Sequence, residues 1–321
     1  MKTSGHELPP DKERVHARAV RLERITIAYL ASAIFVIYLT LGASQAMKTA
    51  WFEDILSLVP PIAFLIATRV RRRAPDRDHP YGWHRAMSIA YLVASIALFG
   101  MGAFLVFDAF TGLASFEHPS IGTVSLFEHE VWLGWLMIPA AAYSAFPAMM
   151  IGRMKLPLAK ELHDKVLFAD AKMNKADWLT GVAAILGVTG IAFGIWWADG
   201  LAAAVISGDI LHDGIQNIRR AVADLMDASP VRVDASGREQ LPSRIENEIK
   251  KLAWVREARV RMRDDGHVFF GEVFVVPRNE EGLTRRLEEA RDLALALDWR
   301  IHDLVMMPVA ELAELADPPP A

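Results

Sequence analysis

Residues 47–73, MKTAWFEDILSLVPPIAFLIATRVRRR, decide the fold class of this chain. Residues 47–70 are mostly apolar and long enough to cross a bilayer, whose hydrocarbon core takes about 20 such residues as a helix. Inside this apolar run lie Glu53, Asp54 and the pair Pro60-Pro61, and an arginine cluster follows it. We therefore expect a membrane-spanning helix that is kinked by its prolines, carries polar groups within the membrane and has a basic end.

Five further stretches are apolar enough to span a membrane. They cover residues 25–41, 87–107, 131–151, 167–195 and 196–215. Hydrophobic residues make up 53% of the chain, which is high for a soluble protein and low for a chain lying wholly in the membrane. The sequence therefore predicts an α-helical membrane domain of six transmembrane helices over residues 25–227, followed by a soluble part. Because there is no cysteine, disulfides and thiolate metal sites are excluded.

Lysine and arginine are concentrated in alternate loops. Lysine or arginine is abundant in the segments 1–24, 69–85, 152–165 and 217–220, whereas the loops 111–131 and 194–200 contain neither. By the positive-inside rule, both termini are predicted to be cytoplasmic, and residues 1–24 form a cytoplasmic N-terminal segment.

The sequence becomes much richer in charge after Asp227. The patterning of residues 231–308 predicts the order helix, strand, strand, helix, strand, with a hairpin turn at Asp265-Gly266. This αββαβ order is typical of a small ferredoxin-like α+β domain, which the charge pattern places in the cytoplasm. Residues 309–321, which end in Pro-Pro-Pro-Ala, are predicted to be a flexible tail.

Three groups of polar residues fall inside the predicted spans. They are Glu53, Asp54 and Ser57 in the second span, Asp170, Asn174 and Asp177 in the fifth, and Asp209, His212 and Asp213 in the sixth. The fifth-span residues are spaced i, i+4, i+7 and share one helical face. An ionisable side chain in a span is costly and marks a candidate functional site. Carboxylate, amide and imidazole groups bind divalent Mn, Fe, Zn, Co or Ni, and protons compete for the same carboxylates.

Structural roles compete with this interpretation. Glu53 and Asp54 lie near the expected outer interface, and Asp170 lies near the cytoplasmic end of its span, where water would solvate them. The group from Asp209 to Asp213 would serve equally as a polar contact between helices. Lys175 would pair with a carboxylate or extend to the interface and so weaken the metal interpretation.

The whole layout resembles the cation diffusion facilitator family. The most specific part is the loop after the second span, where Pro75, Asp76, His79 and Gly82 match a family motif; the stretches 169–177 and 225–230 also match. Members of that family are proton-coupled exporters of divalent metals and are usually homodimers. The resemblance implies a dimer through the cytoplasmic domain, with hydrophobic strand FFGEVFVV, residues 269–276, serving its packing.

The family's usual metal ligands are only partly present. Asp177 matches the second ligand of the fifth span, whereas the first falls on Met173. In the second span the matching pair is Glu53 with Ser57 or, shifted by one residue, Asp54 with Leu58. A site of Glu53 or Asp54 with Asn174 and Asp177 would be rich in oxygen and would favour six-coordinate ions such as Mn²⁺ or Fe²⁺ over zinc.

The peripheral sites of the family are also altered. Asp76 and His79 remain in the loop after the second span, but the third position is Trp83; a packed, salt-bridged loop competes with a metal site there. In the cytoplasmic domain, the family's zinc-binding histidines have no counterparts at the matching positions, so that site is predicted to be lost.

The sequence thus predicts a divalent metal cation/proton antiporter that exports metal by alternating access. The alternative is a transport-deficient, membrane-anchored regulatory or scaffold partner of a related transporter. No motif of an intramembrane enzyme is present, and no cofactor or nucleic-acid partner is expected; the expected partners are the metal ion, the proton, the lipid bilayer and a second copy of the chain. The expected location is a bacterial inner or plasma membrane.

Overall fold

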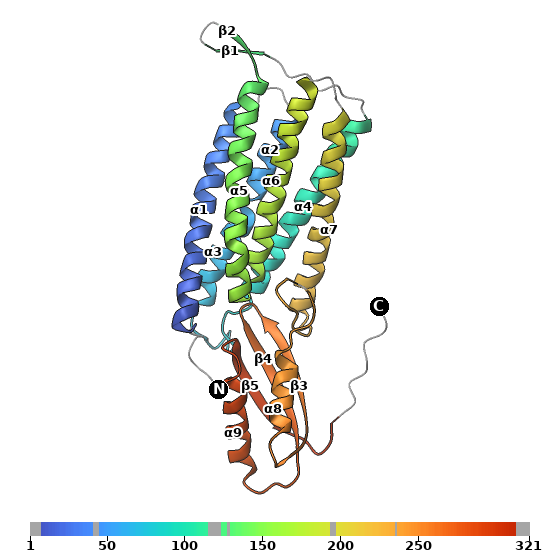
Figure 1. Ribbon diagram of the computed structural model, residues 1–321. Helices are drawn as coiled ribbons and strands as arrows, with labels where there is room; N and C mark the ends of the chain where they lie inside the picture. The colour runs from blue at the N-terminus through green and yellow to red at the C-terminus, as the bar shows by residue number, and fades with distance from the viewer. Residues whose placement is uncertain are drawn as a thin grey trace.

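The computed structural model describes residues 8–40, 45–114, 123–126, 129–192, 197–234 and 236–312. A bundle of long helices stands on a smaller domain of helices and strands (Figure 1). The bundle contains α1 (Pro10–Thr40), α2 (Gln45–Leu56), α3 (Val59–Arg71), α4 (Ala86–Ala114), α5 (Gly134–Leu162), α6 (Lys165–Ala192) and α7 (Trp197–Leu225). The smaller domain contains α8 (Leu241–Lys250), β3 (Val255–Asp265), β4 (Val268–Pro277), α9 (Leu283–Leu295) and β5 (Ile301–Pro308).

The bundle has six membrane crossings, with α2 and α3 together forming the second. Among the described residues, four segments are both long and apolar enough to span a membrane: Pro10–Thr40, Trp51–Arg71, Ala86–Gly112 and Gly134–Leu162. Helices α6 and α7 have 28 and 29 residues and lie beside these in the bundle (Figure 1). At 1.5 Å per residue each is long enough to cross a hydrocarbon core of about 30 Å, although both carry more charge. The six-helix membrane fold class is confirmed.

Two helices extend beyond the spans predicted from hydropathy. Helix α1 begins at Pro10, so residues 10–24 continue the first span as helix. Val15, Ala19 and Leu22 follow helical spacing and are buried, which explains the extension. Helix α5 runs to Leu162, so most of the predicted loop 152–165 is helical and only His163 and Asp164 form the turn into α6.

The second span is broken rather than merely kinked. Helix α2 ends at Leu56 and α3 begins at Val59, with Pro60 and Pro61 in its first turn. These prolines have no N–H group, so the carbonyl groups four residues earlier, on Leu56 and Ser57, receive no helical hydrogen bond. The break therefore leaves backbone oxygen atoms available within the membrane domain.

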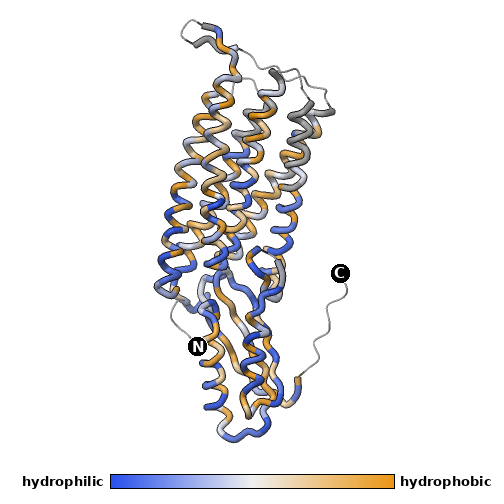
Figure 2. The backbone as a smooth tube through the Cα atoms, in the orientation of Figure 1, coloured by the Kyte–Doolittle hydropathy of each residue, from blue (hydrophilic) through white to orange (hydrophobic). Residues whose placement is uncertain are grey.

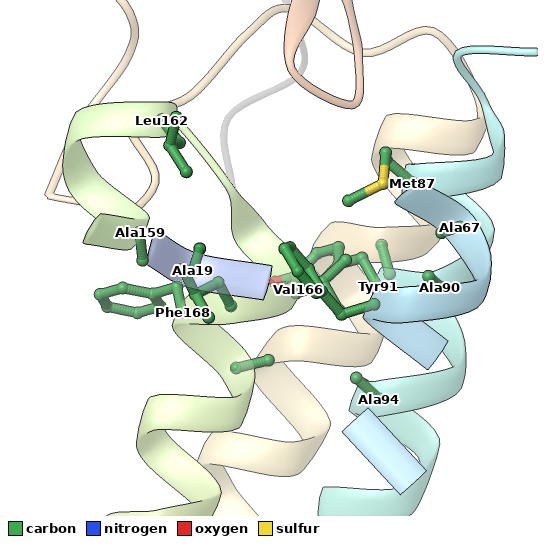
Figure 3. Close-up of a cluster of buried hydrophobic side chains, with 14 of the residues drawn as sticks. Ala19, Ala67, Met87, Ala90, Tyr91, Ala94, Ala159, Leu162, Val166 and Phe168 are labelled. Atoms are coloured by element: carbon green, nitrogen blue, oxygen red, sulfur yellow. The ribbon is translucent and has the colours of Figure 1, made fainter. Parts of the chain in front are cut away.

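Small residues allow the helices to approach closely. At the end of the bundle beside the smaller domain, the buried core contains Ala19, Ala67, Ala90, Ala94 and Ala159 (Figure 3). Farther along, a Cβ atom on Gly102 or Gly214 would lie 2.6 Å from backbone atoms of the facing helix, α7 or α4. These two helices are therefore in direct backbone contact at both glycines.

The C-terminal domain has the predicted αββαβ order. Its sheet has the order β3-β4-β5, with β3 and β4 antiparallel and β4 and β5 parallel. Gly266 adopts φ +79° in the turn between β3 and β4, as expected for the predicted hairpin. Because β4 is the central strand, Phe269, Val273 and Val275 are buried in the core of this domain. Figure 2 shows the more hydrophilic character of this domain compared with the bundle.

At the far end of the bundle, β1 (Thr123–Leu126) and β2 (His129–Trp132) pair as an antiparallel hairpin before α5. The loop expected at residues 194–200 lies partly outside the described residues, since 193–196 are not described.

Buried ion pairs join the bundle to the C-terminal domain. His163 and Lys165, at the turn between α5 and α6, lie 3.1 and 2.9 Å from the Asp264 carboxylate of β3. His267 lies 3.1 Å from Asp164. Burial alone would raise the pKa of Asp164, but the adjacent His267 ring and a hydrogen bond from the backbone N–H of Leu167 outweigh it and hold this pKa below its usual range. The hairpin tip of the C-terminal domain is thus held against the bundle by charged groups.

Candidate metal site

The polar residues of the second span are buried at the break between α2 and α3. Glu53, Asp54 and Ser57 are at most 4% exposed. The Ser57 hydroxyl donates a hydrogen bond of 2.7 Å to Oδ1 of Asp177 on α6. Asp54 and Glu53 of α2 lie close enough to Asp177 to interact with it electrostatically, as does Asp170 on its own helix. The structure therefore brings the second-span and fifth-span groups together.

Neighbouring helices orient the two second-span carboxylates. Ser144 of α5 donates its hydroxyl proton toward both oxygens of Asp54, at 3.1 Å each. The Tyr29 hydroxyl of α1 in turn donates to the backbone carbonyl of Ser144. Glu53 forms a side-chain hydrogen bond with Thr180 of α6. Asp54 is thus held from the α1–α5 side, and Glu53 from the α6 side.

Two buried oxygen atoms on α6 lack a partner in the part of the chain that the structure describes. Oδ2 of Asp177 and Oδ1 of Asn174 are buried, and neither has a hydrogen-bond partner among the described residues. The Asn174 amide nitrogen donates to Asp170, which directs the amide oxygen elsewhere. A buried acceptor without a donor is costly, so both atoms are available for a cation or a proton donor.

Asp170 belongs to a different cluster on the same helix. Its carboxylate accepts a hydrogen bond from Lys155 of α5, and Lys155 also lies 3.0 Å from Glu23 of α1. The side chains of Glu23, Lys155 and Asp170, which we call the buried triad, are at most 1% exposed. Asp170 is therefore buried rather than solvated, and its carboxylate faces a lysine.

Met173 is a packing residue in this structure. It is fully buried among apolar side chains of α4 and α7, including Leu98, Met101 and Ile210. The position of the family's first fifth-span ligand is thus filled by a side chain in the apolar core.

The sixth-span candidates do not share one arrangement. Asp213 forms an ion pair of 2.8 Å with Lys172 of α6. His212 is exposed and contacts Gln216 one turn later, at 2.6 Å. The side chain of Asp209 lies outside the described residues.

The loop candidates form a compact turn of their own. Asp76 accepts hydrogen bonds from the backbone N–H groups of Asp78 and His79, and lies 3.1 Å from the His79 ring. These backbone donors hold the pKa of Asp76 below its usual range. The His79 ring stacks on Trp83 at 3.6 Å, so the aromatic residue packs where the family has a ligand.

Among the described residues, no three His, Asp or Glu side chains are grouped so as to hold a metal ion. The cluster at the α2–α3 break instead combines carboxylates with serine and asparagine oxygens. Sequence reasoning missed Tyr29, Ser144, Glu23 and Lys155. Glu23 and Lys155 were assigned to charged segments outside the spans, and Tyr29 and Ser144 carry no sequence motif; only the helical packing reveals their partners.

A bundle of six membrane-crossing helices with buried carboxylates and a C-terminal α+β domain defines an integral membrane transporter. The model of the cation efflux transmembrane domain family matches residues 24–226. This chain therefore belongs to the cation efflux, or cation diffusion facilitator, family; it is a cation efflux transporter and not an enzyme.

Curated relatives extend over most of the chain. The manganese efflux system protein MneS of Bacillus subtilis is 29% identical over 278 residues, which cover 86% of this chain and 88% of that protein. MneP, a second manganese efflux system protein of B. subtilis, is 25% identical over 80% of this chain and 82% of its own length. The cation-efflux pump FieF of Yersinia pestis is 23% identical over 66% of this chain and 68% of its own length.

Proposed function

We propose that this transporter exports a divalent metal ion in exchange for protons and holds the ion where the α2–α3 break faces α6. The observation that carries the proposal is the Ser57–Asp177 hydrogen bond of 2.7 Å, beside which Oδ2 of the buried Asp177 has no partner among the described residues. The ligands proposed are Asp177, Asn174, Ser57 and whichever of Glu53 and Asp54 turns toward the ion.

The donor set favours a hard cation. Carboxylate, amide, hydroxyl and backbone oxygens suit six-coordinate ions, whereas zinc prefers His or Cys in tetrahedral sites. Mn²⁺ is therefore our first candidate, followed by Fe²⁺, with Co²⁺, Ni²⁺ and Zn²⁺ as further substrates to test. Two relatives that carry the name manganese efflux system protein support this order.

Proton exchange follows from the same carboxylates. When the ion leaves, Asp177 and its acidic neighbours would face one another in a site with little water, and binding protons would relieve their repulsion. The broken second span would let the end bearing Glu53 and Asp54 move relative to α3, which gives alternating access a physical hinge.

The orientation and assembly are also part of the proposal. The arginine-rich end of α3 and the C-terminal domain lie at the same end of the bundle (Figure 1), which the positive-inside rule assigns to the cytoplasm. We further propose a homodimer through the C-terminal domain. Because β4 is the central strand and one of its faces is in the domain core, its other face would contribute to this interface, together with the exposed Val305 and Met307 of β5.

The test is transport by the purified protein in vesicles that contain a pH-sensitive dye. We expect Mn²⁺ to move and to drive a proton flux in the opposite direction. Asp177→Asn should reduce the Mn²⁺ flux at least tenfold, because it removes a charged ligand. Asp213→Asn is the matched control, since that carboxylate pairs with Lys172 instead. Equal flux in the wild type and the Asp177 variant would refute the site.

One observation favours the alternative function. The described residues contain no group of three His, Asp or Glu side chains fit for a metal, which a scaffold that had lost transport would also show. If the wild-type protein transports none of Mn²⁺, Fe²⁺, Co²⁺, Ni²⁺ or Zn²⁺, the scaffold function replaces the antiporter.

A further inference from the structure

A groove runs between α1 and α3 at the end of the bundle beside the C-terminal domain. Its volume is about 590 Å³. Four arginines line it, Arg24 from α1 and Arg69, Arg72 and Arg73 from the end of α3 and the residues after it. The rest of the lining is largely apolar, and no acidic residue contributes to it.

The guanidinium groups of this groove are poorly neutralised by the protein. All four arginines are exposed, and neither Arg24 nor Arg69 has an ion-pair partner among the described residues. Arg72 pairs with Glu13 at 3.2 Å, but both side chains are more than half exposed, so this pair is weak. Arg73 lies 5.4 Å from the ring centre of Trp83. The groove therefore carries an excess of positive charge.

The groove crosses the boundary between apolar and basic surface on the outside of the bundle. Ile25 of α1 and Ile62 and Ile66 of α3 are 48%, 42% and 59% exposed, which is the exposure expected of side chains that face lipid. Ile66 itself lines the groove. In Figure 2 the tube of α1 becomes hydrophilic toward the C-terminal domain. On α3 the apolar Leu65 and Ile66 thus precede Arg69, so the groove joins lipid-facing apolar surface to the basic end of this helix.

A buried hydroxyl in the wall of the groove lacks a partner. Thr68 lines the groove and is 6% exposed. Its Oγ1 atom has no hydrogen-bond partner among the described residues. A buried hydroxyl usually finds a partner, so the wall of the groove contains an unsatisfied polar group beside the arginines.

We propose that this groove binds an anionic phospholipid. Arginine pairs with phosphate through parallel N–H···O bonds, and Arg24 and Arg69 would contact the phosphate from opposite walls. An acyl chain would lie along Leu65 and Ile66. Basic pockets between transmembrane helices bind anionic head groups, and each arginine near the membrane surface strengthens that attraction. The groove is separate from the α2–α3 break, so this inference stands independently of the proposed metal site.

The experiment counts lipids bound to the full-length protein by native mass spectrometry. Phosphatidylglycerol and phosphatidylcholine with identical acyl chains are titrated separately. We expect phosphatidylglycerol to bind at least tenfold more tightly. Arg24→Gln with Arg69→Gln should reduce its affinity about tenfold or more, since two surface cations are lost. Arg153→Gln, an exposed arginine on α5 outside the groove, is the matched control and should change the affinity less than about twofold.

Three outcomes would overturn the proposal. Equal affinity for the two lipids would show that the groove does not select charge. Unchanged phosphatidylglycerol binding in the double variant would place the lipid elsewhere. Displacement of phosphatidylglycerol by millimolar inorganic phosphate would make the groove a site for free anions. Because all substituted side chains are exposed, an unchanged elution volume and thermal unfolding temperature will show that the variants fold.

Discussion

The buried triad gives the sharpest prediction about stability. Lys155 supplies one cation between the carboxyl groups of Glu23 and Asp170, and none of the three side chains is more than 1% exposed. Replacing Lys155 with Met keeps a similar apolar volume but removes the cation. Both acidic groups then remain buried without compensation, and breaking a buried ion pair in this way costs about 3–5 kcal/mol. That range corresponds to roughly a hundredfold to a few thousandfold in the unfolding equilibrium.

The chain contains a matched pair for comparison. Lys172 forms an ion pair of 2.8 Å with Asp213, but these side chains are 27% and 24% exposed. Lys172→Met should therefore cost about 1 kcal/mol or less, because water still solvates the remaining carboxylate. The two substitutions are chemically identical and affect lysines of neighbouring helices, so the difference between their losses of stability measures the effect of burial.

The assay is reversible unfolding of the full-length protein in mixed detergent micelles, followed by helical circular dichroism. Adding Glu23→Gln and Asp170→Asn to the Lys155→Met variant should recover most of the lost stability, because no buried charge remains. If Lys155→Met costs no more than Lys172→Met, the triad does not hold buried charge and the reasoning is wrong. If the triple variant is as unstable as Lys155→Met, the loss of stability comes from packing and not from buried charge.

Adjacent residues of β3 should respond oppositely to pH. Burial raises the pKa of Asp265 to about 6, so the folded protein loses about 3 kcal/mol of stability as the pH rises from about 4 past 6. The asparagine of Asp265→Asn does not ionise, so the thermal unfolding temperature of this variant should not fall over that pH range. Asp264 is also buried, but its ion pairs with the turn between α5 and α6 lower its pKa, so its stabilising contribution is present at neutral pH and declines on acidification below about pH 4. Asp264→Asn should therefore destabilise at pH 7 and do so less and less as the pH falls below about 4; parallel pH profiles for the two variants would contradict this. Gly214→Ala places a Cβ 2.6 Å from the α4 backbone and should lower stability by about 1–3 kcal/mol, whereas Gly208→Ala on the same helix has open space and should not.

Some residues of the site could be found from the sequence because their signal is local. Asp54 and Asp177 stand out as carboxylates within apolar runs, and the i, i+4, i+7 spacing places Asp177 on the same face as Asn174. Their neighbours could not be found in this way. Asp54 is held by a serine 90 residues away, on a helix whose sequence carries no motif for that role.

Helix ends show the limit of hydropathy. Charged side chains lower the mean hydropathy of residues 10–24 and 152–162, so both segments read as loops. In the folded chain their charges turn inward to partners on other helices, as Glu23 and Lys155 do, or outward to water. Helical hydrogen bonds then continue past the apolar run, because the backbone N–H and C=O groups of a helix bond to each other whatever the polarity of the side chains.

Local patterns in the sequence suffice to predict the six crossings, the αββαβ domain that follows them and the helices that carry buried carboxylates. These features follow from apolar length, charge distribution and helical periodicity, which are properties of neighbouring residues. Which charged groups meet is visible only once the helices are packed together. The tertiary structure pairs Ser57 with Asp177 across 120 residues, places Asp170 against Lys155 and gathers four arginines around one groove. Such pairings depend on how the helices pack and rotate against one another, and no local pattern in the chain specifies that geometry.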